Sequence, residues 1–236
     1  MTTRLACFPA MILAVLVIAA APAAAQRQPR AQQGQATPNN DLWLTSAVGI
    51  EYKIDPKWSF HFDLQLQIDR DINRLRTFEA RPGFEYALSP NWAVAAGYVQ
   101  YQHYPTTLRT QRGSFQDLLH RNRFGKITFA GRLRSEELFF ENSTLLVRAR
   151  ALAGIRIPIG DSPWEFALSD EIYVDLKVDG TRREAGFSQN KTFVGFGRPI
   201  SEHLRMSAGY ELNTYEQRGR FRNVHQLRLG VAIKLN

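Results

Sequence analysis

Large apolar side chains alternate with polar ones through residues 58–69, "WSFHFDLQLQID". The apolar positions are Trp58, Phe60, Phe62, Leu64, Leu66 and Ile68. Because successive side chains of a strand point to opposite faces, this period of two predicts a strand with one apolar and one polar face. In a soluble protein the apolar face would cover a core, whereas in an outer-membrane barrel it would meet lipid and the polar face would line the lumen.

The same alternation recurs to the C-terminus. It predicts strands at 42–54, 58–69, 77–88, 92–101, 145–157, 164–176, 187–200, 204–215 and 224–235, with two further candidates within 115–140. Many short strands with turn signals between them, and no amphipathic helix, indicate a barrel or a sandwich. A single-chain bacterial barrel usually has an even number of strands. We therefore expect an all-β, antiparallel transmembrane β-barrel of ten or twelve strands, with twelve favoured, because the region 115–140 or the leader can supply the difference.

The predicted connections are of two kinds. Tight turns are read from "DPKW" (55–58), "SPNW" (89–92), "GDSPW" (160–164) and "SEHL" (201–204), where Pro, Asp, Ser and Asn favour turn conformations. The segments 103–117, 178–186 and 216–223 are polar and read as longer loops. Short turns on one rim and longer loops on the other are typical of an outer-membrane barrel.

Three of the four Trp residues, Trp58, Trp92 and Trp164, follow tight turns directly. In a barrel they would form an aromatic girdle at one membrane–water boundary, where an apolar ring with a polar edge is favoured. The alternative is a soluble sandwich in which strand starts favour aromatic residues.

A short internal repeat accompanies these hairpins. Residues 83–98, "GFEYALSPNWAVAAGY", align without gaps on residues 195–210, "GFGRPISEHLRMSAGY". The match fits a barrel built by hairpin multiplication, with chance or convergence as the alternative.

The N-terminus has the composition of an export signal. Residues 1–25 carry Arg4, a long apolar run and a final Ala-Ala-Ala, which predicts a cleaved signal peptide, with a signal anchor as the alternative. Residues 26–40 are rich in Gln, Ala, Pro and Asn and predict a flexible leader, so that the barrel would span 41–236.

Cys7 is the only cysteine and would leave with the signal, so no disulfide is expected. The formal net charge of +8 would suit a nucleic-acid partner, but an exported chain is not expected to have one. We expect the outer membrane of a Gram-negative cell, and the oligomeric state stays open.

Charged residues occupy the face opposite the apolar stripe. They are Glu51, Asp63, Glu79, Arg81, Arg132, Arg134, Glu136, Arg148, Arg150, Glu171, Lys191 and Glu211. Opposite charges at matched depth can pair, because Arg forms two-pronged hydrogen bonds with carboxylates. Two interpretations compete: the charges brace a narrow or largely plugged lumen, which we favour, or they form a constriction that selects solutes.

Signals of catalysis are few. His61 and Asp63 share a face, but neighbouring lumen residues produce such pairs by default, and no nucleophile, metal or phosphate-binding motif is present. We expect no enzyme, no cofactor and no metal site. The function expected is a structural protein or a narrow pore, and the alternatives are a lipid-modifying enzyme or a soluble, lipocalin-like binder of an apolar ligand.

Several segments resemble a known family from about Trp43 to the C-terminus. They are "GRLRSEELFF", "VRARALAGIRIPI", "ALSDEIYVDL", "FSQNKTFVGFGRPIS", "LRMSAGYELNTY" and "VHQLRLGVAIKL". The chain resembles the bacterial outer-membrane β-barrel family catalogued as domain of unknown function 2490, although Lys191 stands where that family usually has Arg, and the acidic-x-Arg strand start common in the family is weak near "LLHRNRF". The resemblance implies a fold and a location, and no established activity.

The final strand also resembles the signal read by the barrel-assembly machinery, with Arg228, Gly230, Ile233 and Leu235 in its pattern. That machinery and outer-membrane lipid are the partners expected.

Overall fold

The computed structural model describes residues 42–104, 109–141, 144–179, 185–217 and 220–235. The predicted signal peptide and leader lie outside these residues and stay predictions. The eleven strands found in these segments are β1 Leu42–Lys53, β2 Trp58–Asp69, β3 Arg74–Ala87, β4 Trp92–His103, β5 Arg109–Phe124, β6 Ile127–Phe140, β7 Leu145–Pro158, β8 Glu165–Val178, β9 Gly186–Pro199, β10 Leu204–Gln217 and β11 Arg220–Leu235. None of the described residues forms a helix long and apolar enough to cross a membrane.

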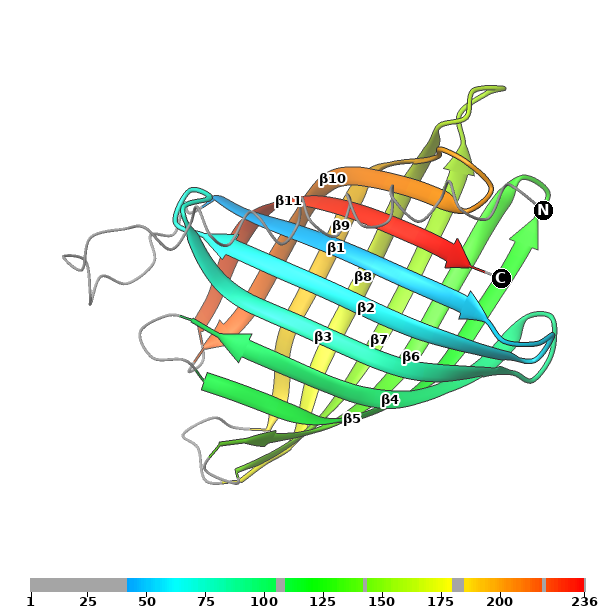
Figure 1. The fold of residues 1–236 in the computed structure, drawn as a ribbon. Helices are drawn as coiled ribbons and strands as arrows, with labels where there is room; N and C mark the ends of the chain where they lie inside the picture. The colour runs from blue at the N-terminus through cyan, green and yellow to red at the C-terminus, as the bar shows by residue number, and fades with distance from the viewer. Residues whose placement is uncertain (1–41, 105–108, 142–143, 180–184, 218–219, 236) are drawn as a thin grey trace.

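The strands close into one barrel in which each strand pairs with its neighbours in sequence (Figure 1). Ten of the pairs are antiparallel hairpin partners, and the eleventh joins the first strand to the last. Closure leaves no free sheet edge, so the backbone groups of every strand can bond to a neighbour.

The expected even number of strands is wrong for the described residues. In a meander of eleven strands the first and the last run in the same direction, so they can close the barrel only by pairing in parallel. β1 and β11 do so over the register from Leu42 beside His225 to Tyr52 beside Leu235, and Figure 1 shows their arrows side by side. Parallel ladders are only slightly less stable per residue than antiparallel ones, and odd strand numbers are known in membrane barrels.

The expected contrast between short turns and long loops is also wrong. β5 begins at Arg109, so most of the polar segment 103–117 is strand, and only residues 218–219 connect β10 to β11. The connection between β7 and β8, which was expected to be tight, spans residues 159–164 and is longer than the connection between β10 and β11. Polar composition predicted a loop where the structure has a strand, because a strand of this barrel can be polar on its inner face. β5 is polar on much of its outer face as well.

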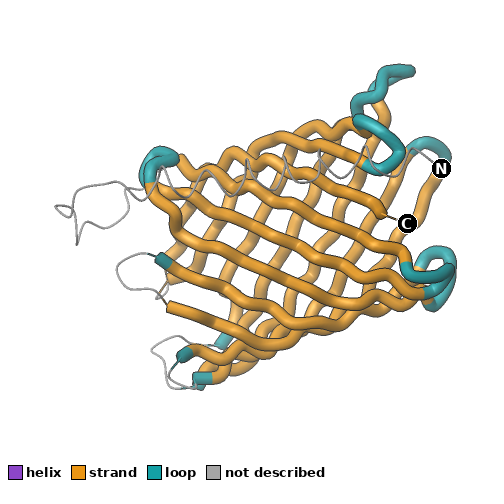
Figure 2. Tube along the Cα trace, in the orientation of Figure 1, coloured by secondary structure: helices purple, strands orange, loops and turns teal. Residues whose placement is uncertain are grey.

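Short polar side chains shape the tight turns that join β1 to β2, β3 to β4 and β9 to β10, which lie at one rim. Figure 2 colours the described loops of both rims teal. The Asp55 carboxylate accepts hydrogen bonds from the backbone N–H groups of Lys57 (2.7 Å) and Trp58 (2.8 Å). The Ser89 and Ser201 hydroxyl oxygens accept from the strand-opening N–H groups of Trp92 and Leu204, both at 3.1 Å. These short polar side chains replace backbone partners that a tight turn lacks.

Trp58, Trp92 and Trp164 lie at this same rim, on the outer face of the wall. Their exposed fractions are 44%, 44% and 46%. The fourth tryptophan, Trp43, is different: it is 1% exposed and lies near the opposite rim, with its ring 6.3 Å from that of Tyr215 and beneath the Arg76 guanidinium.

The internal repeat corresponds to two equivalent hairpins. Gly83 pairs with Gly97 across β3 and β4, and Gly195 pairs with Gly209 across β9 and β10. A Cβ atom at Gly97 would lie 2.8 Å from the Phe115 ring, and one at Gly209 would lie 2.7 Å from the Phe193 ring. Each glycine pair therefore leaves room for an aromatic ring to lie on the inner surface of the wall.

Candidate functional site

The barrel interior carries most of the charged residues. Along β6 the inner positions Arg134 and Glu136 are 5% and 0% exposed, whereas Leu133 on the outer face is 59% exposed. The alternation seen in the sequence thus places charge inside and large apolar side chains outside. This is the opposite of a soluble barrel built around an apolar core.

Glu136 is surrounded by three arginines. Its Oε1 lies 2.6 Å from Nη1 of Arg150, 3.6 Å from Nη2 of Arg81 and 3.8 Å from Nη1 of Arg134. A fully buried carboxylate is stable only with such partners, because burial removes the hydration of its charge.

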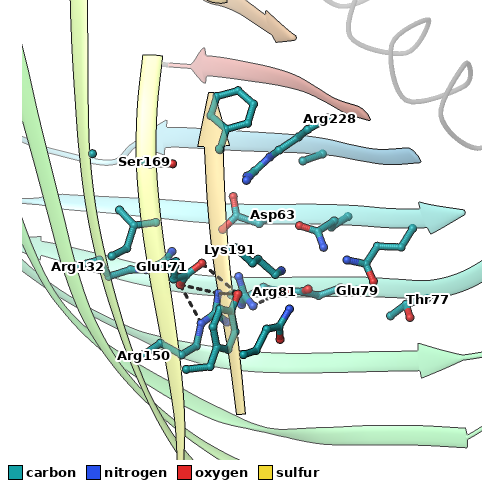
Figure 3. Close-up of a pocket in the computed structure, with 18 of the residues that line it drawn as sticks. Asp63, Thr77, Glu79, Arg81, Arg132, Arg150, Ser169, Glu171, Lys191 and Arg228 are labelled. Carbon is teal, nitrogen blue, oxygen red and sulfur yellow. Dashed lines mark hydrogen bonds and ion pairs between the residues drawn. The ribbon is translucent and has the colours of Figure 1, made fainter. Parts of the chain in front are cut away.

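Glu171 forms a second centre on β8, which is separated from β6 by β7 (Figure 3). Its Oε1 lies 2.7 Å from Nη2 of Arg132 and 2.8 Å from Nη2 of Arg150. The Tyr173 hydroxyl donates to Oε2 of Glu171 at 3.0 Å and accepts from Arg150 at 2.9 Å. Arg150 therefore links Glu136 to Glu171, and the two centres form one network across β6, β7 and β8.

Two acidic partners of the predicted lumen arginines were not identified from the sequence. Asp117 accepts both prongs of Arg134, with Nε to Oδ1 and Nη2 to Oδ2 at 2.6 Å each, and Asp175 lies 2.8 Å from Nε of Arg148. Asp117 stands in a segment read as loop, so its face could not be assigned. Asp175 continues the alternation that includes Glu171, and that signal could have found it.

The remaining predicted charges lie on the same inner surface. Arg81 pairs with Glu79 on its own strand and donates to the Tyr101 hydroxyl at 3.2 Å. Arg228, expected only as part of an assembly signal, donates from Nη1 to Glu211 Oε2 at 2.6 Å. The other three positions of that signal, Gly230, Ile233 and Leu235, lie on β11 with Arg228.

Lys191 and Asp63 are not part of this ion-pair network. Neither has an ion-pair partner within 4 Å among the residues that the structure describes, and Lys191 Nζ lies 5.3 Å from the centre of the Tyr173 ring. Oε2 of Glu51 lies 3.6 Å from Nζ of Lys234. Lys191 and Asp63 both line the free space of the lumen, so their charges are available to a solute.

That free space is a cavity of about 1720 Å³. Its lining runs from Gly49 and Arg156, toward the tight-turn rim, to His103 and Tyr215, toward the other rim. Eight basic and four acidic residues line it: Arg76, Arg81, Arg132, Arg148, Arg150, Arg156, Lys191 and Arg228 against Asp63, Glu79, Glu171 and Glu216.

An apolar cluster fills another part of the interior. Val99, Phe115, Leu138 and Leu146 are at most 4% exposed and pack together on the side of β4–β7. The interior is therefore filled by apolar side chains on the side of β4–β7, and the cavity occupies other parts of the lumen.

The histidine considered for catalysis lies inside the barrel. His61 Nε2 is 3.2 Å from Oε2 of Glu85. Within the described segments, no group of three His, Cys, Asp or Glu side chains could hold a metal ion.

Comparison with known proteins gives a fold and a family. One solved structure, titled as the NanC porin in a rhombohedral crystal form, superposes with a TM-score of 0.50 over 83% of this chain and 99% of its own, at 13% sequence identity. At that identity the similarity concerns the fold alone. No curated protein matches the sequence significantly. The family model described as "Protein of unknown function (DUF2490)" matches residues 40–225, and the chain belongs to that family.

Proposed function

We propose that the protein is a narrow outer-membrane channel for small solutes, with a preference for anions. The observation that carries the proposal is the cavity of about 1720 Å³, whose lining residues reach from one end of the barrel toward the other. A barrel of more than eight strands is wider than its side chains fill, which leaves room for such a passage.

The proposed membrane location rests on the outer face. Exposed large apolar residues include Phe84, Leu133, Leu168, Phe196 and Leu229, each between 39% and 59% exposed. The three exposed Trp residues at one rim have the placement of an interfacial girdle. The structural similarity to a porin supports the same location. A lipocalin-like binder would need the reverse arrangement, with the apolar face inside.

The preference for anions follows from which charges are free. Arg132, Arg148 and Arg150 are held by carboxylates, so their main effect is to brace the wall. Lys191 and Arg156 line the cavity without an ion-pair partner among the described residues, and so does the carboxylate of Asp63. Two unpaired cations against one unpaired carboxylate among these described residues give the free charge of the lining a positive balance, which favours anions.

The lipid-modifying enzyme is the less supported alternative. His61 and Glu85 face the lumen, whereas a membrane lipid would contact the outer wall. Loss of lipid turnover on His61→Ala would favour the enzyme over the channel.

Planar-bilayer recording of the purified protein tests the channel. We expect small, steady conductance and, in a KCl gradient, a reversal potential that indicates chloride preference. Lys191→Glu should reduce or reverse that preference. Lys126→Glu is the matched control, because it makes the same charge change in a turn where the side chain is 74% exposed.

The absence of conductance from folded protein would overturn the channel and favour a plugged, structural barrel. Cation preference in the unaltered protein would overturn the electrostatic argument. Recovery of the protein from the soluble periplasm without detergent would overturn the membrane location.

A further inference from the structure

The outer face of the barrel is not uniformly apolar. On β10, β11, β1 and β2 the outer positions are mainly large and apolar, as with Met206, Leu229 and Leu64. On β5–β9 polar residues occupy outer positions at mid-height: Ser114, Gln116, Ser135, Asp170, Asn190 and Thr192. We call this region the β5–β9 face.

These polar residues lie within the apolar belt rather than beyond it. On β6, Ser135 and Glu137 stand between Leu133 and Phe139, which are 59% and 45% exposed on the same face. On β8, Asp170 stands between Leu168 and Ile172, which are 39% and 43% exposed.

Asp170 is the centre of a small hydrogen-bonded group on this face. Its Oδ2 accepts from Asn190 Nδ2 at 2.8 Å and its Oδ1 accepts from Thr192 Oγ1 at 2.6 Å. The group has no cation within ion-pair distance among the described residues, so a carboxylate is held on the outer wall with neutral partners only.

A groove of about 550 Å³ runs over the same face. Its ridges are Leu118 and Leu133 on one side and Ile172 and Val174 on the other. Between the ridges, Ala149 and Ala151 of β7 leave the backbone close to the surface, and Gln116 and Ser135 lie along the groove edge.

We propose that the β5–β9 face docks a second copy of this chain. The inference rests on the proposed membrane location, but not on conduction. Lipid hydrocarbon offers no hydrogen bonds to amide, hydroxyl and carboxylate groups, so leaving this face in lipid would be costly. Association in membranes uses small residues, which let backbones approach, and polar side chains that bond across the contact.

Self-association fits this face because the face is complementary to itself. A two-fold axis along the membrane normal through the groove lays β5 of one copy near β8 of the other. Near that axis each copy presents the small residues Ala149 and Ala151, with the polar side chains of Gln116 and Ser135 along the same groove. Glutamine and serine each donate and accept, so Gln116 and Ser135 can pair with a like surface.

Cysteine cross-linking in outer-membrane vesicles tests the proposal. In a Cys7→Ser background, Ala151→Cys should give a covalent dimer under mild oxidation. Ala208→Cys is the matched control, because it makes the same change at an exposed outer position of β10. We expect the Ala151→Cys dimer to exceed the Ala208→Cys dimer at least tenfold.

A second variant separates docking from chance collision. Ala149→Trp added to Ala151→Cys fills the groove and should reduce the dimer at least tenfold, whereas Ala208→Trp added to Ala151→Cys should leave it unchanged. Each variant is checked for its folded form by resistance to unfolding in mild detergent.

Equal cross-linking at the two cysteines, or a folded protein that stays monomeric in lipid, would overturn the proposed interface. Both results leave the channel intact, because conductance is measured separately. Recovery of the chain as a soluble protein would overturn the membrane location and the interface together.

Discussion

The pair formed by Asp117 and Arg134 allows a direct test of what the lumen charges contribute to stability. The side chains are 4% and 3% exposed, and two hydrogen bonds of 2.6 Å join them. Because the pair is buried, removing one partner leaves a charge with neither water nor a full set of hydrogen bonds.

Removing one member of a buried pair costs about 3–5 kcal/mol. We expect Asp117→Asn to cost about 3 kcal/mol, at the lower end, because Glu136 still lies 3.8 Å from Arg134. Arg134→Met should cost about 4 kcal/mol because it leaves the Asp117 carboxylate buried. The double variant retains no unpaired charge and should cost only about 2–3 kcal/mol, mainly for a buried amide. The coupling between the two sites is then about 4–5 kcal/mol.

Reversible urea unfolding of the protein in detergent micelles, followed by Trp fluorescence, measures these values. The control cycle uses Lys126→Met and Asp161→Asn, an exposed pair at 3.9 Å that should couple by at most about 1 kcal/mol. If the two buried changes were additive within about 0.5 kcal/mol, the bracing argument would be refuted.

Three further predictions concern the rims and the outer face. Ile72 has a φ of 63°, which is unfavourable for a β-branched residue, so Ile72→Gly should raise the free energy of unfolding by about 1 kcal/mol in the same assay. Leu64→Arg should lower it by about 2–4 kcal/mol in lipid vesicles if the position faces mid-bilayer, and an equal effect from Gln65→Arg, on the opposite face of the strand, would contradict that assignment. The backbone N–H groups of Trp58 and Lys57 donate hydrogen bonds to the Asp55 carboxylate and lower its pKa below the ordinary value of 3.8. The ionised carboxylate therefore stabilises the folded state fully above the pKa of the unfolded state, and this stabilisation is lost as the pH falls through the pKa of the folded state. Asp55→Ala should therefore lower the thermal midpoint at pH 7, with the difference from the unaltered protein closing below about pH 4, and a difference independent of pH would contradict this origin.

The alternation of side chains determined much of this protein. A period of two assigns each residue to one face without knowledge of its neighbours, so residues 58–69 and the flanking strands were placed within a few residues of their observed ends. The same period put Arg132, Arg134 and Glu136 on one face. It failed at residues 109–114, where the outer positions Arg112 and Ser114 are polar and the strand lacks an apolar stripe.

Only the tertiary structure decided how the strands meet. Which carboxylate holds which arginine depends on register, and a shift of one residue would move every side chain to the other face, so the pairing of Asp117 with Arg134 is not contained in either strand alone. The strand number depends on how the ends close: local sequence favours an antiparallel hairpin at each turn, but the joining of β1 to β11 in parallel is a contact between residues about 180 positions apart. The free space of the lumen has the same origin, since the space that remains depends on where Phe115, Leu138 and the arginines pack once the barrel has closed.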